Sequence, residues 1–573
     1  MKSKTLTLLL LFLYNLTAFS QDKTDYIVQD SIVIKTKDSA EICLTVIRSK
    51  SIATPQPCIL YYNIYADTSQ NSIEGGKWIA SKGYVSIEAN TRGKRCSKSQ
   101  IEPFEHDAED AYYIIDWISK QPWSNGKVGM MGSSYLGFSQ WSATKYLHPA
   151  LKTIIPQVAV GAGIDFPKQN GINMTYMLRW IHYVTDNKLT NEKVFEDTTK
   201  WNSLFNNWYK KGNKFASLDS LEGNKNTIFQ RWLQHSGYDT YWQKMIPYQN
   251  DFTKINIPIL TMTGYWDDDQ LGAMYYYKQH NLYNKNSNHY LIIGPYSHYG
   301  YSKILGGFAI DSTAKIKQGD IMVQWFDYVL KDSICPSILK NKVNFEILGD
   351  NKWMHVSSLN KMYNDSLIFY LNNEKTNDKY NLIKAKPKQI KSIEQIVDLT
   401  DRTTFKETGE EIMAFPSLLL DSIKKYPEQL QFETESFENS FVLSGSLIAN
   451  IVASINKKDV DIVIDLYEQL PNGKYLALSR DIQRASYSKG KTIRTLLRPN
   501  KIETIKIENT FITCKKIEKG SKLIAVIGVN KNQNWEINYG SGKEVSQEDI
   551  NDAKIFMKIK WYNSSFLNFK ILK

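Results

Sequence analysis

One stretch of the sequence predicts a strand, a sharp turn and a helix in direct succession: Gly126-Lys127-Val128-Gly129-Met130-Met131-Gly132-Ser133-Ser134-Tyr135-Leu136-Gly137. Glycines on both sides of Ser134 allow a tight, strained turn, and a serine at such a turn projects its hydroxyl out of the sheet. The backbone N–H of Tyr135 then faces whatever that hydroxyl attacks. The spacing Gly132-x-Ser134-x-x-Gly137 is one residue longer than the commoner G-x-S-x-G, so a purely structural turn is the alternative.

Strands and helices alternate on both sides of this turn. Continuous apolar runs predict strands at 57–62, 84–89, 151–158, 257–263 and 289–294. Helical spacing of apolar residues predicts helices at 76–82, 105–120, 271–279 and 319–331. Because strand and helix alternate along the chain, we expect an α/β protein with a parallel sheet covered by helices on both faces.

The chain of 573 residues is too long for one hydrophobic core, and its composition changes along its length. The predicted segments are a signal peptide at 1–20, an α/β core at 21–160 and 238–342, a helical cap at 161–237, and an all-β jelly-roll domain at 343–573. Tryptophans are frequent in the cap, and we expect them to be packing residues rather than substrate contacts. The last segment alternates short apolar runs with turn signals.

The first twenty residues resemble an export signal. Lys2 and Lys4 form a charged start, an apolar run over 6–14 follows, and Ala18-Phe19-Ser20 is a small-residue cleavage site. The apolar run is short for a membrane span, and Gln21 rather than a cysteine follows the cut, so we expect no lipid or membrane anchor. The sequence therefore predicts a periplasmic or secreted protein, with an uncleaved membrane anchor as the alternative.

Composition excludes some classes of function. The net charge is +12, but the lysines are spread along the chain, so we expect solvated faces and no nucleic-acid partner. The five cysteines are scattered and lack metal-ligand spacing, and we predict neither a metal site nor a disulfide framework. No motif for a cofactor is found, so we expect none.

A nucleophilic serine needs a base, and the base needs an acid that orients it. In an α/β sheet these groups must lie after the carboxyl ends of strands. Asp267 and then His298 follow two consecutive predicted strands, and the order Ser134, Asp267, His298 is that of α/β hydrolases. None of the other seven histidines has this placement. The sequence thus predicts a Ser-His-Asp triad, against the alternative of a structural histidine.

An oxyanion formed at Ser134 needs two hydrogen-bond donors. The backbone N–H of Tyr135 is one. Tyr65 follows the first predicted buried strand, and its phenol could be the second, although a packing aromatic is the alternative.

These motifs together resemble the acyl-hydrolase family of cocaine esterase, X-Pro dipeptidyl-peptidase, glutaryl acylase and α-amino-acid ester hydrolase. The resemblance spans nearly the whole mature chain, and its motifs are residues 129–137, Gly264-Tyr265-Trp266-Asp267, Gly294-Pro295-Tyr296-Ser297-His298, Thr91-Arg92-Gly93, 348–353, 461–465 and 471–473. It implies the hydrolase core, cap and jelly roll, the triad, and an oxyanion hole of Tyr65 and the Tyr135 N–H. The run Lys94-Arg95-Cys96-Ser97 departs from the small residues that the family often has there.

The same resemblance bears on substrate recognition. The family's α-amino-acid ester hydrolases bind an ammonium group with three carboxylates, two of which match the positions of Asp269 and, in the early cap, Asp165. The third position holds Gln270. Buried carboxylates favour a cation, so these residues predict ammonium binding. The alternative is that Asp269 caps the following helix and Asp165 is solvated.

We therefore expect a serine hydrolase that cleaves ester, amide or peptide bonds of small acyl or aminoacyl substrates through an acyl-enzyme. An X-Pro-type dipeptidyl-peptidase or an α-amino-acid ester hydrolase is the alternative within this class. A non-catalytic carbohydrate- or peptide-binding protein is the alternative from another class. The expected partner is a small molecule or short peptide, and the aromatic β-domain would allow a homodimer.

Overall fold

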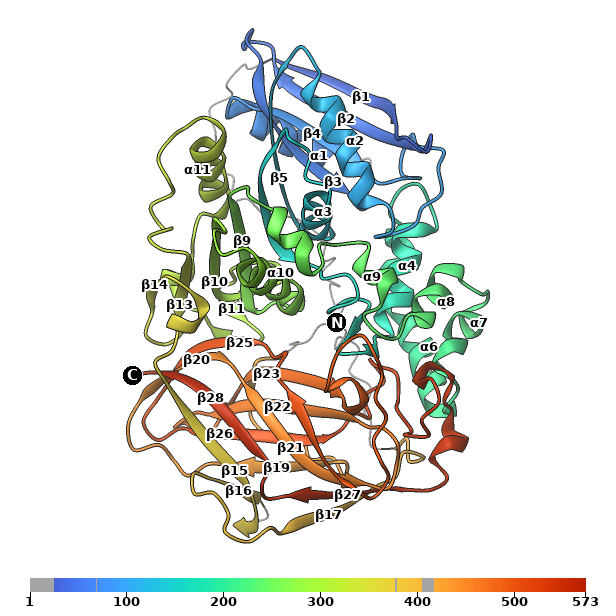
Figure 1. The fold of residues 1–573 in the computed structure, drawn as a ribbon, viewed down its shortest axis with the longest axis vertical. Helices are drawn as coiled ribbons and strands as arrows, with labels where there is room; N and C mark the ends of the chain where they lie inside the picture. Colours follow the sequence, from blue (N-terminus) through green and yellow to red (C-terminus); the bar gives the residue numbers. More distant parts are fainter. Residues whose placement is uncertain (1–24, 68–69, 377–378, 404–416) are drawn as a thin grey trace, which may run out of the picture.

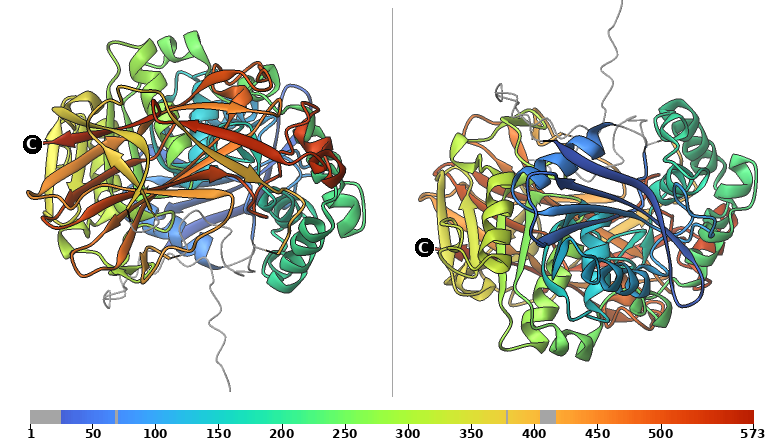
Figure 2. Two further views of the ribbon diagram at one scale, coloured as in Figure 1. Left: turned by 90° about the horizontal axis from the view of Figure 1, so that it is seen from below. Right: turned by 90° about the horizontal axis from the view of Figure 1, so that it is seen from above.

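The computed structural model describes residues 25–67, 70–376, 379–403 and 417–573, and the predicted signal peptide at 1–20 lies outside them. Figure 1 shows an α/β part in the upper half, a β-rich part below it, and a group of helices beside both. Figure 2 shows the same parts from below and from above, where those helices again lie at one side of the molecule. This arrangement confirms the predicted fold class.

A ten-stranded mixed sheet forms the α/β part, in the order β1-β2-β4-β3-β5-β6-β9-β10-β13-β14. Pairing is parallel from β4 through β13 and antiparallel at both ends of the sheet. The strands are β1 (Tyr26–Lys35), β2 (Glu41–Ser49), β3 (Gln56–Asn63), β4 (Val85–Asn90), β5 (Ser124–Ser134), β6 (Leu151–Ala159), β9 (Ile259–Trp266), β10 (His289–Ser297), β13 (Val343–Ile347) and β14 (Lys352–Val356).

Helices cover both faces of this sheet, because its central strands are apolar on both sides. One buried cluster joins α1 and α11 to the sheet through Ile79, Trp325 and Phe326. The other face carries α2, α3 and α10, with Ile114 and Trp141 among its buried residues. The bounds are α1 (Gln70–Ser81), α2 (Asp107–Ser119), α3 (Tyr135–Thr144), α10 (Gln270–Tyr283) and α11 (Gln318–Leu330).

The cap follows β6 and consists mainly of short helices. These are α4 (Tyr176–Thr185), α5 (Glu192–Phe195), α6 (Thr198–Lys211), α7 (Leu218–Glu222), α8 (Thr227–Gln234) and α9 (Thr240–Gln243), preceded by the small hairpin β7 (Lys168–Gln169) and β8 (Ile172–Asn173). Trp201, Trp208 and Trp232 are almost fully buried, as packing residues are. None of the helices in the described parts of the chain is long and apolar enough to cross a bilayer.

The C-terminal part is a β-rich domain whose strands pair into one large curved sheet. Its strands are β15 (Asp365–Thr376), β16 (Lys379–Ile383), β17 (Ser392–Val397), β18 (Leu419–Leu420), β19 (Gln429–Glu433), β20 (Phe441–Ser446), β21 (Ile448–Ile455), β22 (Asp461–Gln469), β23 (Tyr475–Arg484), β24 (Ile502–Ile507), β25 (Ile512–Ile517), β26 (Lys522–Val529), β27 (Met557–Tyr562) and β28 (Phe566–Leu572). The predicted start of this domain at 343 is wrong, because β13 pairs in parallel with β10 and thus extends the α/β sheet.

The sequence predicted no disulfide framework, and the structure contains a single disulfide bond. Cys43 and Cys96 are bonded, and their Cα atoms lie 5.4 Å apart. The two residues are 53 positions apart, and they meet because β2 pairs with β4, which ends just before the Cys96 loop. Cys58, Cys335 and Cys514 are free. Strand pairing brings the bonded cysteines together, and their spacing in the sequence gives no sign of it.

Candidate active site

Ser134 lies at the junction of β5 and α3 in a strained conformation. Its φ is 61° and its ψ is −121°, outside the regions that side-chain-bearing residues favour. The neighbouring glycines permit this turn. A Cβ on Gly132, whose φ is +136°, would lie 2.5 Å from the Leu136 Cβ, and a Cβ on Gly137 would lie 2.7 Å from the Ala159 Cα. The predicted elbow is thus present, and its glycines allow the helix to start close against the sheet.

Asp267 and His298 follow β9 and β10, and the structure places them in contact. His298 Nδ1 lies 2.9 Å from Asp267 Oδ1. The Asp267 carboxylate is fully buried, and it also accepts hydrogen bonds from the Thr263 hydroxyl at 2.6 Å and the Asp269 backbone N–H at 3.1 Å. These bonds fix the carboxylate, so it can hold the imidazole with its Nε2 atom free for a proton from Ser134.

The charge environment of His298 is strongly negative. Burial lowers the pKa of His298, but the hydrogen bond to Asp267 and the charges of Asp269, Asp267 and Asp268 raise it to about 10. Asp269 Oδ2 lies 3.6 Å from His298 Nδ1. These interactions favour the protonated imidazole, and a positive charge that enters the site would lower the pKa of His298 again.

Tyr65 brings its hydroxyl to Ser134. The two hydroxyl groups are hydrogen-bonded, and the indole Nε1–H of Trp180 donates to the Tyr65 oxygen at 3.2 Å. Burial, as the largest cause, raises the pKa of Tyr65 to about 12, so its phenol keeps its proton. Because Trp180 can only donate, the single proton of Tyr65 is left for an acceptor beside Ser134.

The described hydrogen bonds do not join Ser134 to His298. Such bonds are often long without substrate and shorten in the reacting complex. The structure thus contains two pairs from the predicted set, Ser134 with Tyr65 and Asp267 with His298, and both pairs lie where the parallel strands end.

The side chain of Tyr135 anchors the elbow, a role that the sequence did not indicate. Its hydroxyl lies 2.9 Å from both carboxylate oxygens of Asp107 and accepts the Phe104 backbone N–H at 3.1 Å. Asp107 begins α2, and burial raises its pKa to about 8. This contact fixes the first residue of α3, whose N–H is the predicted oxyanion donor.

Asp165 and Asp269 are both close to the pair formed by Asp267 and His298, but they differ in their contacts. Asp165 is buried, and its two oxygens accept the backbone N–H groups of Gly161, at 2.8 Å, and Gly272. Asp269 occupies the N-cap position of α10 without a side-chain capping bond. The Asp269 carboxylate is therefore less tied by hydrogen bonds to the protein than that of Asp165. Asp165 connects the segment that leads into the cap with the first turn of α10.

Three further residues near the site were missed by the sequence analysis. Asp268 adds a third consecutive carboxylate, and burial raises its pKa to about 6. Trp180 was expected only to pack. Arg179 precedes it on α4 and is buried. The triplet of aspartates at 267–269 was the available signal for Asp268, whereas no pattern in the cap distinguishes Trp180 or Arg179.

Gln270, which occupies the third family position, is directed elsewhere. It is fully buried, its Nε2 donates to the carbonyls of Gly264 and Ile512, and its Oε1 accepts the Ile512 N–H. It therefore connects the start of α10 to the β-rich domain. The departing run at 94–97 also has a structural role, because buried Lys94 donates to the carbonyls of Val184 and Asn187 in the cap.

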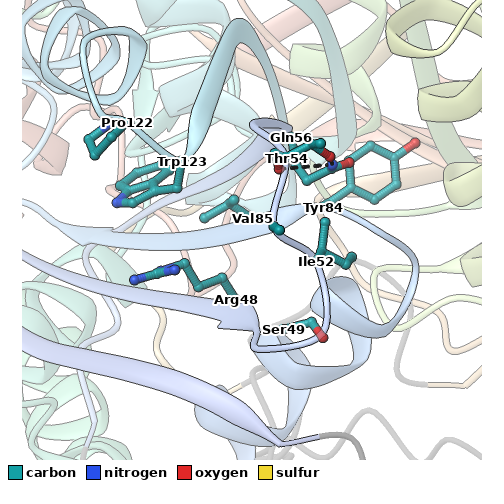
Figure 3. Close-up of a pocket in the computed structure, with 10 residues that line it drawn as sticks. Arg48, Ser49, Ile52, Thr54, Gln56, Tyr84, Val85, Pro122 and Trp123 are labelled. Carbon is teal, nitrogen blue, oxygen red and sulfur yellow. Dashed lines mark hydrogen bonds between the residues drawn. The ribbon is translucent and has the colours of Figure 1, made fainter.

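Two pockets lie outside this set of residues. One, of about 180 Å³, is lined by Arg48, Thr54, Gln56, Tyr84 and Trp123 among others, at the ends of strands where β3, β4 and β5 begin (Figure 3). Substrates of α/β sheets bind at the opposite edge, so this pocket is not a candidate for the triad's substrate. The other, of about 420 Å³, lies between the loop at 99–102 and the cap at 185–188 and 226–231.

Comparisons with known families give two matches. The sequence profile described as X-Pro dipeptidyl-peptidase (S15 family) matches residues 38–300. The profile described as X-Pro dipeptidyl-peptidase C-terminal non-catalytic domain matches residues 354–557. The first match includes the elbow, the cap and the His298 loop, and the second covers most of the β-rich domain.

Individual relatives agree with these matches. Cocaine esterase of Rhodococcus sp. (strain MB1 Bresler) is 21% identical over 569 residues, which cover 92% of this chain and 95% of that protein. Xaa-Pro dipeptidyl-peptidase of Lactobacillus helveticus (strain DPC 4571) is 25% identical over 112 residues, 17% of this chain and 14% of that protein.

Two solved structures share the whole fold. An aminopeptidase from a marine sediment Thaumarchaeota archaeon has a TM-score of 0.81 at 17% identity, with 98% of this chain and 99% of that one covered. An α-amino acid ester hydrolase has a TM-score of 0.80 at 19% identity with the same coverage. At this identity the likeness shows the arrangement of core, cap and β-rich domain.

Proposed function

Since the chain belongs to the X-Pro dipeptidyl-peptidase (S15) family, we propose that it is an exported serine hydrolase that cleaves ester, amide or peptide bonds of small acyl or aminoacyl substrates. The hydrolase class follows from the family and its esterase and peptidase relatives. The observation that supports the mechanism most strongly is the 2.9 Å contact between His298 Nδ1 and buried Asp267, beside the Ser134 elbow.

Each residue then has a defined role in an acyl-enzyme mechanism. Neutral His298 takes the proton of Ser134 as its oxygen attacks the substrate carbonyl, and Asp267 stabilises the imidazolium that forms. The Tyr65 hydroxyl and the Tyr135 N–H donate to the carbonyl oxygen as it becomes negative. His298 gives its proton to the leaving alcohol or amine, the acyl group stays on Ser134, and water releases it by the same steps.

Replacement of the nucleophile tests this mechanism. Ser134→Ala is expected to lower the hydrolysis of acetyl and butyryl nitrophenyl esters to background, with the melting temperature within a few degrees of wild type. Ser133→Ala is the matched control, because Ser133 precedes the nucleophile in the same turn. Retained hydrolysis in Ser134→Ala would show that another group attacks.

A second activity, recognition of a free α-amino group, is favoured by the carboxylates around His298. The hydrogen bond to Asp267 and the charges of Asp269 and Asp268 raise the His298 pKa against the effect of burial, and the triad itself requires only Asp267. A substrate ammonium at Asp269 would offset this charge and lower the His298 pKa, so that the imidazole could act as a base. We propose that the preferred substrates are aminoacyl esters or short peptides with a free N-terminus.

Paired substrates test the second activity. Free-amine phenylglycine methyl ester and Gly-Pro and Ala-Pro anilides are compared with simple nitrophenyl esters in wild type and Asp269→Asn. Preference for the free-amine substrates that Asp269→Asn abolishes would support an ammonium site. An unchanged preference in Asp269→Asn would assign a structural role to Asp269 and leave a general acyl esterase.

A further inference from the structure

Arg179 is a buried cation in the cap whose position is fixed on one side only. Its side chain is 7% exposed. The Nε–H donates to the Phe195 carbonyl at 2.7 Å, and the guanidinium carbon lies 4.5 Å from the centre of the Phe195 ring. The α5 end of the cap therefore holds the guanidinium plane in place, as is needed for recognition of a planar anion.

Within the described parts of the chain, the other edge of this guanidinium has no protein partner. Among residues 25–67, 70–376, 379–403 and 417–573, no carboxylate lies within ion-pair distance of Arg179, and its two terminal nitrogens make no hydrogen bond. Burial lowers the pKa of Arg179, and the charges of Tyr176, Glu196 and Tyr299 offset this only in part. An ion this buried is usually paired, so a missing anionic partner is expected.

Ring contacts connect this open edge to the oxyanion hole. The Phe195 ring that supports Arg179 also lies 4.3 Å from the ring of Tyr183, and Tyr183 stacks on Tyr65 at 5.8 Å. Trp180, the next residue on α4, contacts the Tyr65 hydroxyl directly. Arg179 thus belongs to the face of the cap that covers the predicted reaction centre.

Tyr299 interacts electrostatically both with Arg179 and with the carboxylates of Asp268 and Asp269. It follows His298 in the chain, with 5.8 Å between the ring centres, and its side chain is 65% exposed. Partial desolvation and the charges of Asp268 and Asp269 raise the pKa of the Tyr299 phenol, although much of this residue is exposed, whereas the charge of Arg179 lowers it. Tyr299 is therefore within electrostatic reach of a cation in the cap and of anions in the core.

We propose that Arg179 binds the terminal carboxylate of the substrate, so that the enzyme acts on short peptides with both termini free. This inference rests on the proposed function. The substrate ammonium lies at Asp269 on the acyl side, and the carboxylate of the leaving residue lies at Arg179. A peptide with a free amino group and a free carboxylate would pair with both Asp269 and Arg179, on either side of one reaction centre, whereas a neutral ester would pair with neither.

The test compares alanyl-phenylalanine with its C-terminal amide, which differ only in the carboxylate. Release of phenylalanine or its amide is followed by chromatography, and competition by each peptide against nitrophenyl acetate hydrolysis is measured in parallel. Wild type is expected to prefer the free acid by about 10- to 100-fold in kcat/KM or in inhibition, the effect of a charge-assisted bidentate contact. Arg179→Gln is expected to lose this preference while it keeps activity on the amide and on nitrophenyl acetate.

Two further variants separate recognition from folding. Arg179→Lys keeps the charge but not the paired donors, so an intermediate preference is expected. Arg231→Gln is the matched control, because Arg231 is the other arginine of the predicted cap and pairs with Glu102 and Glu105. Any effect of Arg231→Gln on kcat/KM or on inhibition is expected to be equal for the two peptides.

The outcomes distinguish this inference from the proposed function. Equal use of acid and amide by wild type, an unchanged preference in Arg179→Gln, or failure of both peptides to compete would overturn the role of Arg179. Each of these results would leave Ser134-dependent ester hydrolysis standing. Loss of all hydrolysis in Ser134→Ala is a separate requirement, and its failure would overturn the proposed function itself.

Discussion

Trp180 donates its indole N–H to the phenolic oxygen of Tyr65 at 3.2 Å, and this bond joins the cap to the predicted oxyanion hole. The indole is held between other rings, since it stacks on Phe104 at 5.5 Å and on Tyr135 at 6.1 Å. The Tyr65 hydroxyl has one proton, and the Trp180 N–H bonds to one lone pair of its oxygen, which directs that proton away from the cap. Trp180 of the cap therefore orients the hydroxyl donor of Tyr65, which belongs to the α/β part.

Trp180→Phe should lower kcat about tenfold or more with little change in KM, because a misdirected donor stabilises the oxyanion less well. Steady-state kinetics on a nitrophenyl ester check this. Tyr65→Phe should lower kcat about a hundredfold or more, and the double variant should be no slower than Tyr65→Phe alone.

Trp201→Phe is the control for this prediction. Trp201 is another buried cap tryptophan, and its Nε1–H donates to the Val194 carbonyl at 2.7 Å. Its loss should cost stability without a selective loss of kcat. Additive effects of Trp180→Phe and Tyr65→Phe would contradict the coupling between the two residues.

Asp269→Asn should move the pH dependence of ester hydrolysis to lower pH. The hydrogen bond to Asp267 and the charge of Asp269 raise the His298 pKa to about 10, and only neutral His298 can accept the Ser134 proton. Removal of one negative charge lowers that pKa, so the rising limb of kcat/KM should shift down by about one to three pH units. If kcat/KM rises at the same pH in wild type and in Asp269→Asn, Asp269 does not act on the pKa of His298.

Asp165→Asn should cost stability rather than specificity. The carboxylate accepts two backbone N–H groups, from Gly161 and Gly272, and an amide side chain can satisfy only one of them through its oxygen. The expected loss is about 1 to 3 kcal/mol in the free energy of unfolding. Denaturant unfolding measures it. Unchanged stability together with a lost preference for free amines would instead place Asp165 in direct contact with substrate.

Cys96→Ser should destabilise the protein, because the bond to Cys43 closes a loop of 53 residues. The expected loss is about 2 to 4 kcal/mol. Thermal unfolding with and without a thiol reductant measures it, and the reductant should lower the melting temperature of wild type but not of Cys96→Ser. Equal sensitivity of both proteins to reductant would contradict a Cys43–Cys96 bond in solution.

Local sequence signals predicted the features that depend on neighbouring residues. The glycines around Ser134 predicted the elbow, and the apolar runs before Asp267 and His298 predicted that both follow buried strands, since side-chain pattern and turn chemistry are local. Features that depend on distant segments were not accessible in this way. The Cys43–Cys96 bond follows from the pairing of β2 with β4, and the membership of β13 in the α/β sheet follows from its pairing with β10.

The functional roles of cap residues were likewise not predictable from local sequence. Arg179 and Trp180 are neighbours on one amphipathic helix, and the sequence alone does not show which face covers the site. Their roles depend on Phe195 and Tyr65, which lie on other segments. Aromatic residues at helical spacing indicate packing in most proteins, and the contact with Tyr65 distinguishes Trp180 only once the fold is known.

Labelling with a fluorophosphonate probe, followed by mass spectrometry of the digested protein, identifies which serine is the nucleophile, and we expect it to be Ser134. A single adduct is expected on the peptide that contains Ser134, with slow labelling in His298→Ala and none in Ser134→Ala. An adduct on another serine, or labelling that persists in Ser134→Ala, would show that Ser134 is not the nucleophile.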